Sequence, residues 1–257
     1  FPLVSKSIGE KFETLFRKFN VKDSPDADSL IEVFTETISL SSHIFQLLSP
    51  DLIDAFLDMS PSLDLNECIF NYVELNLCDK IWNRLCEING DFLIEHYDDL
   101  EFLSLNQVSL PKSSQHNIPL YHILEKRISQ AITEFKKLEL AVTTVSKIKI
   151  LVNTINLLSN IESVTVDADT LVGLLLMVIV HSKVTNLESH LFYIQNFSFQ
   201  NIDLGFVGYS LSTLEGVLYY LKDIENIRTL KKYSQNNQRV ISVSYTHLRA
   251  HETRRHL

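Results

Sequence analysis

The sequence predicts an all-α protein, folded as a layered helical bundle, on three observations. Apolar residues recur three and four positions apart, which is the spacing of an amphipathic helix. No Asn-Gly or Asp-Gly pair lies between two alternating apolar and polar runs, so the hairpin pattern of a β-protein is missing. All six Pro lie at or before Pro119, which leaves the rest of the chain open to long uninterrupted helices.

The first part of the chain carries apolar residues on one face of several expected helices. A first helix is expected over residues 8–19 and a second over 30–45. Ser49-Pro50-Asp51 has the composition of a helix start, with Pro suited to the first turn. The stripe from Ile69 to Leu85 predicts a further helix, and Gly90 is expected to end it as a C-cap.

The middle of the chain alternates between helical patterns and one polar stretch. Another helix is expected over residues 91–106, followed by a turn-prone linker or exposed loop over 107–118. Helical spacing then returns over residues 121–138 and 145–158. The most apolar helix is expected over residues 168–180, and its apolar run is about half the length that spans a bilayer.

Two capping-box patterns predict the starts of the next helices. Thr185-x-x-Glu188 is expected to open one helix, and Ser212-x-x-Glu215 to open another after a Gly-rich loop over residues 205–212. A polar, fraying helix is expected over residues 224–240. No internal repeat is visible, which favours a bundle over a solenoid.

The two ends of the chain stand apart. It begins Phe-Pro-Leu-Val without an initiator Met, so we expect a fragment of a longer protein. We interpret residues 244–257 as a sequencing-adapter or cloning artefact, because this His- and Arg-rich stretch resembles a translated adapter and has no apolar periodicity. Without its three Arg and one Glu, the formal charge changes from −9 to −11, with 20 basic against 31 acidic residues.

Composition and motifs exclude several classes of function. The acidic balance argues against a nucleic-acid-binding protein, which gathers Lys and Arg on one face. No Gly-rich phosphate loop, Gly-x-Ser-x-Gly elbow or His-Glu-x-x-His motif is present. The three Cys have no metal-ligand spacing, so neither a metal nor a cofactor is expected. These tests favour an interaction module over an enzyme with covalent chemistry.

One constellation remains after these exclusions. Asp167 and Asp169 stand at the start of the most apolar helix, where an acid can cap free N–H groups and is favoured by the helix dipole. Some thirty-five residues on, Gly208 and Tyr209 lie in the Gly-rich segment. Without further information, a helix cap and a simple turn are the plainest interpretations.

The same segments resemble the vacuolar-protein-sorting-nine (VPS nine) domain. The resemblance rests on Ala168 to Leu171, on Leu187 to Phe197 with Tyr193-Ile194 inside, and on Gly208 to Glu215. It is specific over residues 164–223 and weaker back to Phe70. The last segment is most similar to the branch whose members also carry ankyrin repeats, although no ankyrin pattern is present in this chain.

The resemblance implies a guanine nucleotide exchange factor for a Rab five-like small GTPase of endosomes. Asp169 matches the family's acidic finger, which enters the nucleotide site, pairs with the phosphate-loop Lys and excludes Mg²⁺ and GDP. Tyr209 matches a Tyr that packs beside the GTPase switch region. The implied GTPase-binding positions are Gly173, Leu176, His190, Tyr193, Gly208 and Ser212. Asp167 is the expected cap, or the finger itself if the alignment is shifted by two residues.

The resemblance also implies the domain organisation and the setting. We expect an N-terminal helical segment (1–63), the exchange domain (64–232), a fraying segment (233–243) and the artefact (244–257). The implied partner is a Rab five-like GTPase in its GDP-bound or nucleotide-free form, with no nucleic acid and no direct membrane insertion. The implied location is cytoplasmic, peripheral to endosomal membranes, within a larger multidomain chain.

Two departures from the family pattern leave an alternative open. Gly173 stands where the family commonly has Pro, and His190 where it often has Asn. A non-catalytic module of the same fold, which binds a GTPase or another endosomal protein without ejecting nucleotide, is therefore the second hypothesis. A third takes residues 1–106 as a docking bundle for a partner protein.

Overall fold

The computed structural model describes residues 2–21, 24–46, 58, 64–101, 103–105, 118–161, 166–199, 202 and 205–236. Every regular element in these ranges is helical, so the predicted all-α fold is confirmed. The chain divides into two compact units, Phe1–Asn89 with Asn196–Gln200, and Gly90–Gln195 with Asn201–Leu257. The domain limits expected at 63/64 and 232/233 stay a prediction.

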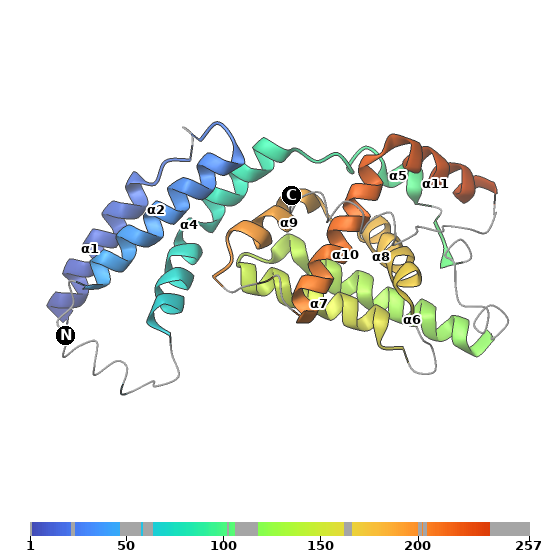
Figure 1. The fold of residues 1–257 in the computed structure, drawn as a ribbon, viewed down its shortest axis with the longest axis horizontal. Coiled ribbons are helices and arrows are strands. Elements are labelled where there is room, and N and C mark those ends of the chain that lie inside the picture. The colour runs from blue at the N-terminus through green and yellow to red at the C-terminus, as the bar shows by residue number, and fades with distance from the viewer. Residues whose placement is uncertain are drawn as a thin grey trace. The chain divides into compact units, whose positions relative to one another are not determined.

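The described residues of the first unit contain three long helices, α1 (Pro2–Lys18), α2 (Ala27–Gln46) and α4 (Leu65–Asn89) (Figure 1). Helix α2 packs against both of the others. Aromatic rings fill the space between them: Phe34 lies 5.6 Å from Phe70 and 5.1 Å from Phe197, centroid to centroid. Edge-to-face pairs of this kind add to the stabilisation from burial.

Two basic side chains of α4 donate hydrogen bonds to backbone carbonyls at the end of α1 and in the segment between α1 and α2. Lys80 Nζ donates to the Phe16 carbonyl at 2.8 Å, at the C-terminal end of α1. Arg84 donates twice to the Ser24 carbonyl, at 2.7 and 3.1 Å. A cation at a helix C-terminus satisfies carbonyls that have no partner within the helix.

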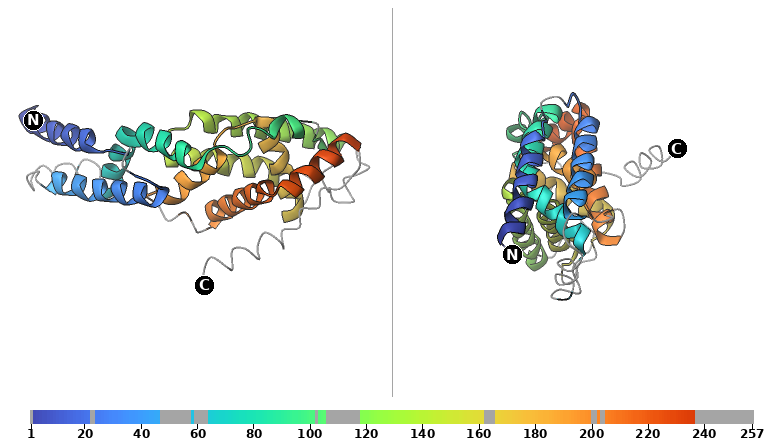
Figure 2. Two further views of the ribbon diagram at one scale, coloured as in Figure 1. Left: turned by 90° about the horizontal axis from the view of Figure 1, so that it is seen from above. Right: turned by 90° about the vertical axis from the view of Figure 1, so that its left-hand side faces the viewer.

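The second unit contains eight helical elements in the described residues. They are α5 (Tyr97–Leu100), α6 (Ile118–Phe135), the 3₁₀ helix η2 (Lys136–Leu140), α7 (Thr144–Ser159), α8 (Ala168–Ser182), α9 (Leu187–Asn196), α10 (Gly205–Lys222) and α11 (Ile224–Asn236). Figure 2 shows the ribbon from two further sides. Helix α8 is in contact with α6, α7 and α10. Its residues from Thr170 to Val180 are all buried, so α8 is the core of this unit.

No single helix in the described ranges has the length and apolar composition to cross a membrane. Helices α8 and α9 meet that test only as a pair, and the pair is bent by 117°.

The helix start expected at Ser212 is wrong. Helix α10 begins at Gly205, which has a φ of +64°, so Ser212 lies inside the helix and is not its N-cap. The Ser210 and Thr213 hydroxyls donate to the carbonyls four residues earlier, each at 2.7 Å. Burial of Leu211 together with the rest of the inner face keeps the glycine-rich segment helical, since packing overrides its low helix propensity.

The capping box expected at Thr185 is also wrong. Helix α9 begins two residues later, at Leu187, and Asn186 before it has a φ of +54°. The Asn186 N–H donates to the Asp91 carboxylate at 2.8 Å, and Glu188 forms an ion pair with Lys222. The Glu188 carboxylate, which a capping box would direct to the Thr185 N–H, is therefore engaged by a tertiary partner, and the φ of Asn186 excludes it from the first helical turn.

The expected helix over residues 91–106 is reduced to the four residues of α5. Asp91 accepts a hydrogen bond from the Leu93 N–H at 3.2 Å, which holds a turn in place of a helix. The buried Tyr97 hydroxyl donates to the Val184 carbonyl at 2.5 Å, which ties this segment to the end of α8. Gly90 has a φ of +66° directly after α4, so the predicted C-cap glycine is confirmed.

The remaining expected helices are observed with shifted ends, and some predictions lie outside the described residues. Helix α6 begins at Ile118, the last residue of the expected loop over 107–118. Helix α11 is described as far as Asn236. Ser49-Pro50-Asp51, residues 107–117 and residues 244–257 are outside the described ranges.

Candidate functional site

The start of α8 separates the two acidic residues that the sequence brings together. Asp167 is the N-cap: it has extended backbone, and its carboxylate accepts a hydrogen bond from the Thr170 N–H at 2.8 Å. Its carbonyl accepts the first helical bond, from the Leu171 N–H at 2.9 Å. The structure therefore confirms that Asp167 caps the helix.

Asp169 lies in the first turn of α8 and is exposed to solvent. The helix dipole makes this end of α8 a favourable place for an acidic residue. Further along the helix, Gly173 and Leu176 are both buried in the core. Asp169 is thus a surface carboxylate on a helix that the rest of the unit holds in place.

Helix α10 carries several aromatic side chains that are at least partly exposed. Tyr209 is half-buried against the core, and its ring centroid lies 6.0 Å from that of Phe206. Phe206 is 41% exposed, and Tyr219, thirteen residues further along the helix, is 51% exposed. Of the other residues predicted here, Gly208 is buried and Ser212 is half-buried. Helix α10 packs against α8, so Asp169 and Tyr209 belong to adjoining helices.

The two predicted residues on α9 lie inside the protein. His190 is 2% exposed and Tyr193 is 0% exposed. Neither side chain is accessible, so neither can contact a GTPase directly in this structure. Both instead face Lys147 of α7: its Nζ lies 3.0 Å from His190 Nδ1 and 5.5 Å from the centroid of the Tyr193 ring.

Lys147 completes a buried polar cluster with His190 and Tyr193. It is only 2% exposed, and its Nζ also donates to the Ala141 carbonyl at 2.6 Å. Burial, followed by the nearby charge of Lys147, lowers the pKa of His190 well below its usual value. The neutral imidazole can therefore accept the hydrogen bond from the ammonium group.

Lys147 was not predicted as part of the site, although its position in the sequence indicates that it is buried. Lys147 occupies the helical spacing of the buried residues of α7, between Thr144 and Leu151. A lysine in such a stripe predicts a buried partner, because an uncompensated charge in the core is strongly unfavourable. The partner itself, 43 positions further along the chain, is not visible in the pattern.

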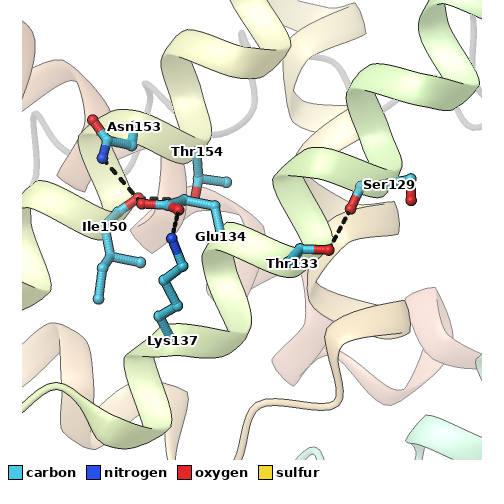
Figure 3. A network of polar contacts seen from close by, with 7 residues as sticks. All are labelled: Ser129, Thr133, Glu134, Lys137, Ile150, Asn153 and Thr154. Carbon is cyan, nitrogen blue, oxygen red and sulfur yellow. Dashed lines mark hydrogen bonds and ion pairs between the residues drawn. The ribbon is translucent and has the colours of Figure 1, made fainter.

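A second polar network joins α6, η2 and α7 (Figure 3). Glu134 accepts a hydrogen bond from Asn153 Nδ2 at 3.0 Å and forms an ion pair with Lys137. Partial burial opposes the ionisation of Glu134, but these hydrogen bonds, together with the charges of Lys137 and Lys149, lower its pKa overall. The network fixes the connection between α6 and α7.

In the part of the chain that the structure describes, no group of three or more His, Cys, Asp or Glu side chains is placed to hold a metal ion.

Comparison with known proteins identifies the second unit. Residues 128–226 match the family model of the Vacuolar sorting protein 9 (VPS9) domain. The chain carries a VPS9 domain. Residues 1–90, which include the three long helices of the first unit, match the UPF0507 helical domain. All eight predicted site residues fall within the range that matches the VPS9 domain.

Several yeast proteins share both parts. A UPF0507 protein of Scheffersomyces stipitis is 35% identical over 92% of this chain and 23% of its own length. A UPF0507 protein of Debaryomyces hansenii is 36% identical over 88% of this chain and 22% of its own length. The chain therefore spans less than a quarter of these relatives. A VPS9 domain has a fold of the exchange-factor or Rab-binding type, and its kind of partner is a small GTPase.

Proposed function

We propose that this VPS9 domain is a guanine nucleotide exchange factor for a Rab five-like small GTPase. The observation that carries the proposal is the exposed Asp169 carboxylate on the first turn of the buried helix α8. A group that is already held in place loses little conformational entropy when it docks. It is thus suited to enter a nucleotide site.

In the proposed reaction, a carboxylate of this protein replaces the GDP phosphates as the partner of the phosphate-loop Lys. In the GTPase, Mg²⁺ and the phosphate-loop Lys neutralise the phosphates. Asp169 supplies a competing carboxylate for that Lys and repels the β-phosphate, so Mg²⁺ and GDP leave. A charge-assisted bond of this kind is about twice as strong as a neutral hydrogen bond. No covalent bond is made or broken, and no cofactor is required.

The remaining site residues have supporting roles in this proposal. Tyr209, with the exposed Phe206 and Tyr219 along α10, offers an aromatic surface for the switch region of the GTPase. Gly173 and Leu176 are buried in α8 and Gly208 is buried in α10, while Ser212 is half-buried. We assign His190 and Tyr193 to positioning α9, because their side chains are inaccessible.

The wider setting belongs to the same proposal. We place the protein in the cytoplasm, at the surface of endosomal membranes, with ankyrin repeats among the further domains of the full-length protein. This placement follows from the family resemblance alone.

Release of a fluorescent GDP analogue from a panel of Rab GTPases tests the proposal. We expect the chain to accelerate release from a Rab five-like member and Asp169→Ala to abolish the acceleration. The second candidate, a non-catalytic GTPase-binding module, is favoured by Gly173 and His190 in place of the commoner residues. It predicts binding in a pull-down with nucleotide release at the spontaneous rate, which would exclude the catalytic role.

A further inference from the structure

The connection between α6 and α7 displays apolar side chains on the surface. Leu140 is 85% exposed, Val142 is 47% exposed and Val145 is 53% exposed. These three residues lie within six positions of one another, at the end of η2 and the start of α7. We call residues 136–149 the basic turn. Exposed apolar side chains that lie together mark a site of contact with a membrane or a partner protein.

The same segment is positively charged in an acidic protein. The exposed charged side chains of the basic turn are three Lys and Glu139, a formal charge of +2, whereas the whole chain carries −9. Its fourth Lys, Lys147, is buried and does not belong to this surface. Lys136, Lys137 and Lys149 are exposed, and the last two both act on the carboxylate of Glu134. Exposed lysines therefore flank the three apolar side chains.

Hydrogen bonds hold the basic turn in one conformation. The Thr143 and Ser146 side chains form a reciprocal capping box at the start of α7. The buried Lys147 donates a hydrogen bond to the Ala141 carbonyl from the protein interior. The Glu134 network in Figure 3 anchors Lys137 at the other end. The protein thus fixes the backbone of a segment that exposes leucine and valine side chains, and a fixed surface loses less entropy on binding.

We propose that the basic turn docks on an anionic membrane surface. Leu140, Val142 and Val145 enter the boundary between headgroups and acyl chains, and the lysines lie at the level of the anionic headgroups. This mode of contact is peripheral and needs no spanning helix. Docking through the basic turn would orient the VPS9 domain on the membrane. This docking does not depend on exchange activity.

Sedimentation of the 257-residue chain with lipid vesicles tests this inference. We expect binding to phosphatidylcholine vesicles that contain about one third phosphatidylserine, weaker binding at high salt, and little binding to phosphatidylcholine alone. Leu140→Ala and Lys136→Glu should each weaken binding about tenfold. The controls on α11, Ile224→Ala and Lys232→Glu, alter exposed side chains outside the basic turn and should stay within about twofold of the wild type.

Three results would overturn the inference. The first is equal binding to neutral and anionic vesicles. The second is a loss of binding in the α11 controls as large as in the basic-turn variants. The third is no vesicle binding combined with weaker GTPase binding by Leu140→Ala, which would make the turn a protein contact. Circular dichroism melting curves of the four variants establish that each is folded.

Discussion

The Asp167 carboxylate accepts a hydrogen bond of 2.8 Å from the Thr170 N–H, and this contact assigns different roles to two acids that stand two residues apart. Asp167 is occupied as the N-cap of α8, while Asp169 is exposed on the first turn. Substitution of Asp167 should therefore mainly lower stability, and substitution of Asp169 should mainly lower exchange activity.

We expect Asp167→Ala to lower the free energy of unfolding by about 1–2 kcal/mol, because it removes the cap and a charge near the positive helix end. Asp169→Ala should lower it by only about 0.5 kcal/mol, because Asp169 is exposed and is not the N-cap of the helix. Urea unfolding followed by circular dichroism measures both. Equal losses at the two positions would contradict the assigned roles.

Lys147 should contribute strongly to stability, in contrast to its neighbour Lys149. Lys147→Ala removes a buried stem and leaves the Ala141 carbonyl without its donor, so we expect a loss of about 2–4 kcal/mol. Lys149 is exposed, and Lys149→Ala should change stability by no more than about 0.5 kcal/mol. The comparison uses the same substitution on one helix, measured by urea unfolding. A small effect at Lys147 would mean that water replaces it easily.

His190 predicts a pH dependence of stability below neutrality. Its pKa in the folded protein is lowered from 6.5, by burial and then by Lys147. Below that value the unfolded chain binds a proton that the folded chain does not, so stability falls as the pH falls. The full contribution is present above about pH 6.5, and the loss reaches about 1.4 kcal/mol per pH unit. Unfolding measured between pH 5 and pH 7 should show a smaller slope for His190→Asn. An unchanged slope would mean that other groups cause the dependence.

Two glycines should respond to alanine in opposite directions. Gly90 has a φ of +66°, and a Cβ there meets no atom within 4 Å, so the loss in Gly90→Ala comes from the backbone alone and is about 1 kcal/mol. Gly9 lies inside α1 with the same open space, and Gly9→Ala should stabilise the protein by up to about 1 kcal/mol. Thermal melting of the two variants is the measurement. A gain at Gly90 would contradict its role as a helix end.

The sequence was sufficient wherever local pattern and tertiary packing agree. Helix α8 and its Asp167 cap follow from an apolar run preceded by an acid. Helix α10 was not predictable in the same way, because the glycines at its start indicate a loop and only packing of its inner face keeps them helical. The contact of Lys147 with His190 joins two helices 43 residues apart, so no local pattern contains it. The burial of His190 and Tyr193 has the same origin.

The most direct test of the proposed function compares GDP release by three proteins on one Rab five-like GTPase at fixed Mg²⁺. The wild-type chain and Asp167→Ala, assayed where the latter is folded, should accelerate release to a similar extent. Asp169→Ala should lose at least about 30-fold, which is the lower end of the effect of removing one partner from a buried charge pair. Full activity of Asp169→Ala, or its loss only in Asp167→Ala, would contradict the account.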